Sequence, residues 1–372
     1  MKRWFAVILA LILVLPALPA LAEGPDMEVP GLNYTGTLPL RFAHQFRVDY
    51  FEGGYKLLSI ADGNRYLVVP EGGEVPKGLS GVRILQQPLD HIYLAATSAM
   101  ALFNAVDALD AVTLSGTQAD GWYIQAASRA MEDGRMLYAG KYSEPDYELL
   151  LSSGCDLAIE STMILHTPQV QEMIEQLGIP VFIDRASYED HPLGRTEWVK
   201  LYAALMNRER EAAAFFDEQA AVVDALADFA NTEQTVAFFY IASDGSVNVR
   251  STTDYVPVMI ELAGGRYALG GTLEDAGARS SVSISMEDFY AAAVDADYLI
   301  YNASIDAPLY SVDDLLGKSA LFADFKAVKA GHVFTTDSYL YQATDIVAQL
   351  VVDINRMLLG ETEGMTFLRH IG

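Results

Sequence analysis

The residue types most able to perform chemistry in this chain are six histidines and one cysteine, and their spacing supports no catalytic centre. No pair of histidines has the close spacing of a zinc site, since they stand at His44, His91, His166, His191, His332 and His370. The sequence also lacks the patterns G-x-S-x-G, G-x-x-x-x-G-K-[ST] and H-E-x-x-H. We expect Cys155 to be a small buried residue. These patterns give little support for an enzyme.

A second group of side chains, able to bind ligands, follows the segments that we expect to be strands. The group is rich in tyrosine and contains few clustered cations. In the first half of the chain it consists of Thr97, Ser98, Trp122, Tyr123, Thr162, Met163, His166, Tyr188 and Arg195. In the second half it consists of Arg250, Tyr255, Tyr301 and Tyr339. The same loops also carry Ser161, Glu189, His191, Asn302, Ser338 and Tyr341.

Aromatic walls with a few hydrogen-bond donors suit a large flat or chelated ligand. Arg195 and Arg250 are candidates for holding an anionic group, because a planar guanidinium binds a carboxylate at two points. The alternative for each arginine is a structural salt bridge. Tyr301 is equally compatible with a core position, and His166 with an ordinary surface position.

These side chains need strands and helices to position them, and the sequence predicts a change of architecture near residue 85. Before it, alternating apolar residues in FRVDYFEGGYKLLSIADGNRYLVVP predict three strands separated by two turns. A connector rich in glycine and proline, PEGGEVPKGLSG, follows these strands. Beyond the connector, apolar strands and helical stretches alternate along the chain.

The clearest unit of this alternation is DLAIESTMILHTPQVQEMIEQLGIPVFID. We expect a strand from Asp156 to Ile159, a helix that starts at Pro168 and stops at Gly178, and a second strand at 181–184. A strand, a crossover helix and a strand within about 30 residues imply a parallel sheet covered by helices.

A helical sequence of unusual length, free of glycine and proline from Thr196 to Thr235, separates two such blocks. We expect one long helix that joins two lobes. The predicted fold class is therefore α/β, with two Rossmann-like lobes that contain parallel sheets and a ligand cleft between the lobes. The expected parts are a signal peptide, a β-rich extension, a first lobe, the joining helix and a second lobe, at 1–22, 23–84, 85–193, 194–231 and 232–372.

The first 22 residues, MKRWFAVILALILVLPALPALA, are typical of an export signal that is removed near Ala22. No other segment approaches the roughly 20 apolar residues that span a bilayer, so we expect an extracytoplasmic protein without direct membrane insertion. Because Cys155 is the only cysteine, we expect no lipid-anchor cysteine beside the cleavage site. Removal of Lys2 and Arg3 changes the net charge from −26 to −28, which repels nucleic acid.

Four stretches of the chain resemble the substrate-binding proteins of ABC transporters that carry iron-siderophore complexes, haem and cobalamin. They are LAATSAMALFNAVDALDAVTLSGT, PDYELLLSSGCDLAI, TPQVQEMIEQLGIPVFIDRASYEDHPLGRTEWVK and MEDFYAAAVDADYLIYN. With the closing GHVFTTDSYLYQATDIVAQLVVDI, the resemblance covers about residues 85–358. It implies a monomeric protein without a cofactor of its own that delivers an iron or cobalt chelate to membrane permease subunits.

In the family that this chain resembles, a glutamate before a strand in each lobe contacts the permease. Glu148 matches this position in the first lobe, eight residues before Asp156, and Glu287 matches it in the second lobe, ten residues before Asp297. Because the second spacing is longer, Asp288 is an alternative to Glu287. The other interpretation of these acids is that they only stabilise the first turn of a helix.

Two further functions are compatible with the sequence. A carrier of free zinc or manganese would use His91, His166 and Glu189, although a histidine-rich loop is missing. A secreted α/β enzyme would use His166 or His191 as a general base.

Overall fold

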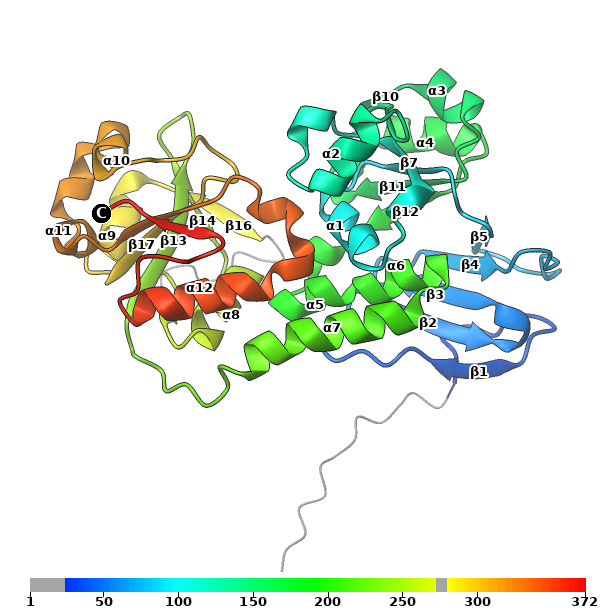
Figure 1. The fold of residues 1–372 in the computed structure, drawn as a ribbon, viewed down its shortest axis with the longest axis horizontal. Coiled ribbons are helices and arrows are strands. Elements are labelled where there is room, and N and C mark those ends of the chain that lie inside the picture. The colour runs from blue at the N-terminus through cyan, green and yellow to red at the C-terminus, as the bar shows by residue number, and fades with distance from the viewer. Residues whose placement is uncertain (1–23, 272–279) are drawn as a thin grey trace, which may run out of the picture.

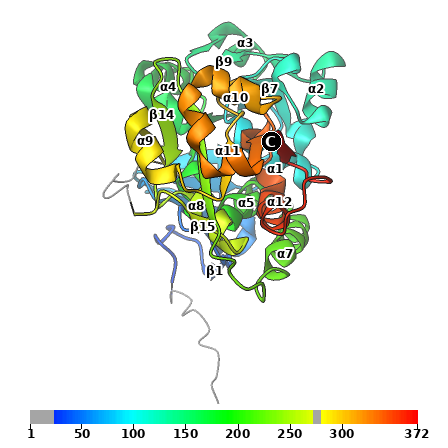
Figure 2. The same ribbon diagram turned by 90° about the vertical axis from the view of Figure 1, so that its left-hand side faces the viewer.

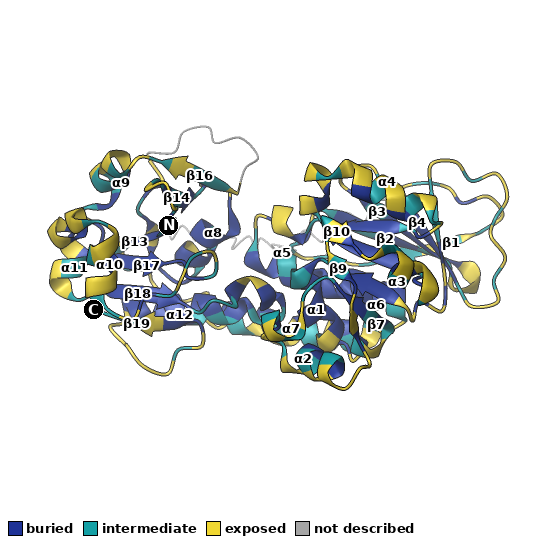
Figure 3. Cartoon of the chain, turned by 90° about the horizontal axis from the view of Figure 1, so that it is seen from above, coloured by how far each residue is buried: buried dark blue, intermediate teal, exposed yellow. Residues whose placement is uncertain are grey.

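The structure is a computed structural model that describes residues 24–271 and 280–372, and its elements form two lobes joined by a helical connector (Figure 1). The expected signal peptide, residues 1–22, lies outside the described residues. Seen from above, each lobe has buried strands at its centre and more exposed helices at its outer surface (Figure 3). The expectation of two α/β lobes is confirmed.

The N-terminal lobe is built on a fully parallel sheet with the strand order β12-β11-β6-β7-β8. Its strands are β6 (Ile92–Leu94), β7 (Val112–Ser115), β8 (Leu137–Tyr138), β11 (Leu157–Ser161) and β12 (Val181–Asp184). Its helices are α1 (Thr97–Ala105), α2 (Gln125–Glu132), α3 (Tyr147–Ser152) and α4 (Pro168–Gln176), with a small hairpin of β9 (Gly140–Lys141) and β10 (Glu144–Pro145).

The helix signals read from the sequence hold in this lobe. Pro168 occupies the first turn of α4, where the missing N–H is not needed. Gly178 follows the helix with φ 82°, a left-handed conformation that stops α4. The helix α4 connects β11 to β12, which are parallel neighbours. Because parallel strands end at one edge of a sheet, the loops after β11 and β12 lie at the same edge.

The C-terminal lobe has a mixed sheet, in which antiparallel strands flank the parallel strands expected from the sequence. Parallel pairing joins β15, β13, β17 and β18, whereas β14, β16 and β19 are antiparallel to their neighbours. The strands are β13 (Thr235–Ile241), β14 (Val247–Arg250), β15 (Arg266–Tyr267), β16 (Ser281–Ile284), β17 (Tyr298–Tyr301), β18 (Val333–Thr336) and β19 (Leu368–His370). A tight turn at Asp244-Gly245 sends β14 directly back along β13, so no crossover helix intervenes.

The helices of this lobe are α8 (Tyr255–Leu262), α9 (Met286–Ala293), α10 (Val312–Lys318), α11 (Lys326–Ala330) and α12 (Ala348–Leu358). Ser319 has an extended backbone and separates α10 from the segment that leads to α11. Figure 2 shows α10 and α11 at the end of this lobe that faces away from the N-terminal lobe.

The β-rich extension forms a five-stranded sheet that packs against the N-terminal lobe. Its strands are β1 (Tyr34–Thr37), β2 (Phe46–Phe51), β3 (Lys56–Ile60), β4 (Arg65–Val69) and β5 (Arg83–Gln86), in that order across the sheet. Alternate side chains of β4 point to opposite faces: Tyr66 and Val68 enter the main core, and Leu67 and Val69 enter a small outer core. The Tyr66 hydroxyl donates to the carbonyl of Val181 in β12, at 3.0 Å.

The connector is not the single helix that the sequence predicted over residues 194–231. It consists of α5 (Pro192–Glu197), α6 (Val199–Met206) and α7 (Glu209–Asp224). Asn207 has φ 56° and ψ 42°, a left-handed conformation that ends α6 and turns the chain so that α7 runs back beside α6 and α5. Asparagine adopts this conformation more easily than most residues, so the helix ends without a glycine. The helix α7 extends to the C-terminal lobe, where it packs against α12.

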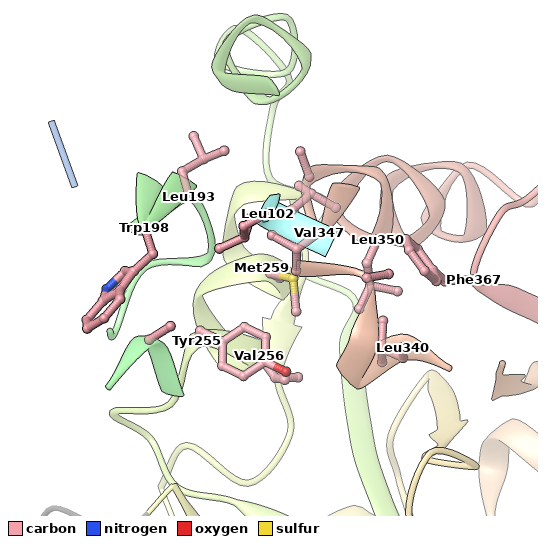
Figure 4. Close-up of a cluster of buried hydrophobic side chains, with 14 of the residues drawn as sticks. Leu102, Leu193, Trp198, Tyr255, Val256, Met259, Leu340, Val347, Leu350 and Phe367 are labelled. Atoms are coloured by element: carbon pink, nitrogen blue, oxygen red, sulfur yellow. The ribbon is translucent and has the colours of Figure 1, made fainter. Parts of the chain in front are cut away.

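The two lobes share one continuous apolar core. Figure 4 shows labelled members of this cluster from α1, the connector and the C-terminal lobe: Leu102, Leu193, Trp198, Tyr255, Val256, Met259, Leu340, Val347, Leu350 and Phe367. The helix α5 contacts α8 of the C-terminal lobe, and α1 contacts the segment 340–346. Trp198 is completely buried, as expected for a packing residue of the connector. A shared core of this kind resists large movements of one lobe against the other.

Candidate ligand-binding site

A cavity of about 690 Å³ lies between the lobes, within the range of small-molecule sites in proteins. The N-terminal lobe supplies residues from the loops after β11 and β12, which are Thr162, Met163, His166, Ser187, Tyr188, Glu189 and Asp190. The C-terminal lobe supplies Thr253, Asp254, Ser280 and Ser281, and the β-rich extension supplies Gln45. We call this space the interlobe cavity.

The loop of the extension that carries Gln45 is held by two buried glutamates of the connector region. The carboxylate of Glu189 accepts hydrogen bonds from the backbone N–H groups of His44 (2.8 Å) and Gln45 (2.9 Å). It also accepts one from the indole N–H of Trp198, at 2.9 Å. Burial raises the pKa of Glu189, while these three donors favour its ionised form. The extension is therefore part of the wall of the interlobe cavity.

Glu197 fixes the preceding part of the same loop. Its carboxylate accepts hydrogen bonds from the backbone N–H groups of Arg41, Phe42 and Ala43, at 2.8 to 3.0 Å. The ammonium group of Lys200 donates to the same carboxylate at 2.7 Å. Because Glu197 is fully buried, these donors compensate for its lost hydration.

On the opposite wall, Asp254 precedes α8 and accepts a hydrogen bond from the backbone N–H of Val256, at 3.0 Å. Its carboxylate lies 3.8 Å from the guanidinium of Arg250. Burial raises the pKa of Asp254, and the charges of Arg250 and Arg195 act in the opposite direction. Arg250 is thus engaged in a structural ion pair and is not among the residues that line the cavity.

Two residues of α5 form contacts that connect the two lobes. The guanidinium carbon of Arg195 lies 4.1 Å from the ring centre of Tyr255 in α8, a cation-π contact across the lobe boundary. The hydroxyl of Thr196 donates to the carbonyl of Thr344 at 2.9 Å, and both residues are buried. The structure therefore uses Arg195 and Tyr255, both expected to bind ligand, as partners of each other.

A second bridge between the lobes joins Tyr123 to the segment after β18. The hydroxyl groups of Tyr123 and Ser338 are 2.7 Å apart, and the rings of Tyr123 and Tyr339 lie 5.1 Å apart between centres. The side chain of Gln342 accepts from the backbone N–H of Tyr123 and donates to the carbonyl of Gly121. Tyr123 and Tyr339 are thus brought together, but neither lines the interlobe cavity.

The remaining expected ligand residues lie elsewhere. Trp122 is buried and donates its indole N–H to the hydroxyl of Ser115, at 3.1 Å. Tyr301 is completely buried in the C-terminal lobe and donates its hydroxyl to Asp306, which corresponds to the core interpretation. Thr97 and Ser98 begin α1 and are half-buried. Of the thirteen expected ligand residues, the cavity therefore collects only Thr162, Met163, His166 and Tyr188.

Sequence reasoning missed most of the polar residues on the other walls. Thr253 and Asp254 follow β14, whose antiparallel direction places its carboxyl end away from the carboxyl ends of the parallel strands. The alternation Val-Asn-Val before Arg250 was the available signal for this strand. Gln45 gave no local signal, because its position depends on hydrogen bonds to Glu189, 144 residues away.

Both acids expected to contact a permease are exposed at the starts of short helices, one in each lobe. Glu148 stands in the first turn of α3, and Glu287 in the first turn of α9. Asp288 differs from Glu287, because its carboxylate accepts a hydrogen bond from the hydroxyl of Ser285 at 2.8 Å. In Figure 3, α3 and α9 lie in different lobes, on either side of the connector.

Among residues 24–271 and 280–372, the side chains close enough to share a metal ion are Asp90, His91 and Asp156. They lie where β6 and β11 begin, whereas His166 and Glu189 follow the carboxyl ends of strands. The set expected for a free-metal carrier is therefore not brought together. His191 accepts a hydrogen bond from the backbone N–H of Leu193 and stacks on Phe42, so it stabilises the start of α5.

A family model described as periplasmic binding protein matches residues 105–340, which is more than half of the chain. The chain belongs to the periplasmic binding protein family. The resemblance noted in the sequence is thereby confirmed, and so is the α/β fold with parallel sheets. Members of this family are solute-binding proteins that work with ABC importers, so this periplasmic binding protein is not an enzyme. The matched residues begin after the β-rich extension.

This periplasmic binding protein is 24% identical over 325 residues to an uncharacterized lipoprotein of Methanocaldococcus jannaschii, covering 82% of this chain and 74% of the relative. A periplasmic haem-binding protein of Vibrio cholerae has a similar structure, with a TM-score of 0.58, 15% identity, and coverage of 72% of this chain and 98% of that chain. A periplasmic catecholate-siderophore-binding protein of the same organism gives a TM-score of 0.57, 13% identity, and coverage of 73% and 94%. At these identities the two structures show a common fold.

The name of the Methanocaldococcus relative describes a lipoprotein, whereas we expected no lipid-anchor cysteine here. The only cysteine of this periplasmic binding protein is Cys155, which is buried before β11. Within the described residues, no helix is both long and apolar enough to cross a membrane.

Proposed function

We propose that this binding protein captures a metal chelate, such as an iron-siderophore complex, haem or cobalamin, in the interlobe cavity and delivers it to the permease of an ABC importer. The observation that carries the proposal is the cavity itself. It lies between the two lobes of a periplasmic binding protein fold, and residues of both lobes and of the extension contribute to its wall. Solved proteins with the same fold include periplasmic binding proteins for haem, for a catecholate siderophore and for vitamin B12.

The proposal assigns Glu148 and Glu287 to permease contacts made by a monomeric, loaded protein. Both carboxylates are exposed, so they can meet a basic surface without first being removed from an internal ion pair. Asp288 is less suited to this role, because its carboxylate already accepts a hydrogen bond from Ser285. A charge at the rim of an interface mainly changes association with the partner.

Charge reversal separates capture from delivery. We expect Glu148→Lys and Glu287→Lys to lower chelate uptake by at least about tenfold, because each replaces an attraction to a basic permease surface with a repulsion. The dissociation constant of the purified protein for the same chelate should change by less than about twofold, since both residues lie outside the cavity. Uptake is measured in cells that carry the matching permease, and binding by quenching of tryptophan fluorescence.

Trp198 is the expected fluorescent reporter, because its indole contacts Glu189 in the cavity wall. The matched control is Glu132→Lys, which reverses an exposed charge at the end of α2 in the same lobe as Glu148. Equal loss of binding and uptake in the Glu148 variant would contradict the docking role. Failure of every haem, cobalamin and ferric siderophore probe to bind would contradict chelate capture.

A further inference from the structure

The described wall of the interlobe cavity carries an excess of negative charge. Three of its residues are acids, Glu189, Asp190 and Asp254, and none of those described is lysine or arginine. His166 is the one histidine among the described lining residues, and its side chain is exposed. An anionic ligand in this cavity would therefore contact no lysine or arginine of the described lining residues.

Among the described residues, three arginines beside this wall contact other side chains. The guanidinium of Arg185 lies 4.2 Å from the ring centre of Tyr188, and that of Arg195 lies 4.1 Å from the ring centre of Tyr255. Arg250 lies 3.8 Å from Asp254 and offsets the charge of that acid. The ring contacts leave the charges of Arg185 and Arg195 in place, but neither arginine lines the cavity, so Glu189 and Asp190 are the charges of the described lining that no lining cation offsets. Asp190 lines the cavity and is exposed to solvent.

The uncharged polar groups of the wall are almost all hydroxyls. They belong to Thr162, Ser187, Tyr188, Thr253, Ser280 and Ser281, and the amide of Gln45 joins them. Hydroxyl and amide groups donate hydrogen bonds to the oxygen atoms of a chelate without requiring that the chelate be charged. The net charge of the whole chain, −26, adds a long-range repulsion of anions.

From the charge of this wall we propose that the interlobe cavity selects metal chelates that carry no net negative charge and holds them through hydroxyl and amide groups. The inference rests on the proposed function and narrows its ligand class. A neutral or cationic ferric trihydroxamate fits this description, because three singly charged hydroxamates balance the ferric ion. A ferric tricatecholate and haem with ionised propionates do not fit, since both keep negative charges that would meet Glu189 and Asp190.

The test compares four probes with the purified protein: a neutral ferric trihydroxamate, a cationic ferric trihydroxamate, a ferric tricatecholate and haem. We expect the trihydroxamates to bind at least about tenfold more tightly than the tricatecholate and haem. This difference should shrink as salt is added, because salt screens the exposed charge of Asp190. Dissociation constants from fluorescence titrations at two ionic strengths provide the measurement.

One substitution tests whether the cavity wall causes the preference for chelates without negative charge. Asp190→Asn should strengthen tricatecholate binding by at least about threefold and leave the neutral trihydroxamate nearly unchanged. The control Glu132→Gln removes an exposed acid outside the cavity and should alter neither probe. Tighter binding of the tricatecholate or haem than of the trihydroxamates would overturn the inference while leaving chelate capture intact. Binding of none of the four probes, and no binding of cobalamin either, would overturn both.

Discussion

Glu160 lies on β11 with both carboxylate oxygens buried and without a hydrogen-bond partner among the described residues. Its neighbours on this face of the sheet are apolar side chains and the ring of Tyr93. Burial raises the pKa of Glu160 well above its ordinary value, because the charged form loses its hydration without compensation. The loop that follows Glu160 contributes to the interlobe cavity, so this unpaired carboxylate lies close to the cavity in the sequence.

Glu160 makes stability depend on pH. Below the pKa of the unfolded glutamate, about 4.3, both states hold the proton and the group adds no penalty. As the pH rises above this value, the unfolded chain releases the proton first, so the free energy of unfolding falls until the folded pKa is passed. We expect Glu160→Gln to remove this loss and to stabilise the protein by at least about 1 kcal/mol near pH 7.

Urea unfolding at several pH values between 4 and 8 measures the effect. The matched control is Glu172→Gln, which changes an exposed glutamate of α4 in the same lobe. A pH profile of Glu160→Gln parallel to that of the unmodified protein would show that Glu160 carries no such penalty.

At the residue scale, the sequence predicted one wall of the site and missed the others. Thr162 and Tyr188 were identified because they follow parallel strands, where the position of a loop is determined by the sheet itself. Tyr301 also stands at the end of a parallel strand, in the other lobe, but its side chain is buried. Its hydroxyl donates a hydrogen bond to the carboxylate of Asp306. A rule based on strand ends gives the edge of the sheet but not the face to which a side chain points.

At the scale of elements, the main departure from the prediction is the connector. The absence of glycine and proline indicated a continuous helix, yet Asn207 ends α6 in a left-handed conformation. The side-chain oxygen of Asn207 accepts a hydrogen bond from Lys56 in β3, at 2.7 Å. This partner is 151 residues away, so the turn is stabilised by tertiary contacts that local sequence patterns do not contain.

Among the contacts between elements, we expect the contact of the extension with α5 to be the most sensitive to substitution. In Glu197→Gln, an amide N–H would oppose the donors of Lys200 and of the backbone at 41–43. We expect the free energy of unfolding to fall by about 3 kcal/mol, because buried donors lose their charged acceptor. Calorimetric or urea unfolding measures the loss, and amide hydrogen exchange at residues 41–43 locates it.

Glu218→Gln serves as the control for this substitution, because Glu218 is an exposed glutamate on α7. Unchanged stability of Glu197→Gln, with unchanged exchange of the three amides, would mean that the extension does not depend on this carboxylate for its position.

At the scale of the whole molecule, the two-lobed architecture could be predicted because alternating strands and helices leave few topologies for a chain of this length. The shared core between the lobes and the contribution of the extension could not, because both depend on contacts between distant segments. Thr196 with Thr344, and Tyr123 with Ser338, join segments 148 and 215 residues apart. These contacts hold the lobes at a fixed separation and thereby define the cavity.

The most direct test of the account is the position of the metal in crystals of the protein loaded with a neutral ferric trihydroxamate. Anomalous diffraction at the iron absorption edge locates the ion independently of the rest of the chelate. The account predicts a single strong peak in the interlobe cavity, between Tyr188 of the N-terminal lobe and Thr253 of the C-terminal lobe. A peak outside this cavity, such as one beside His91, or crystals of protein that take up no iron, would contradict it.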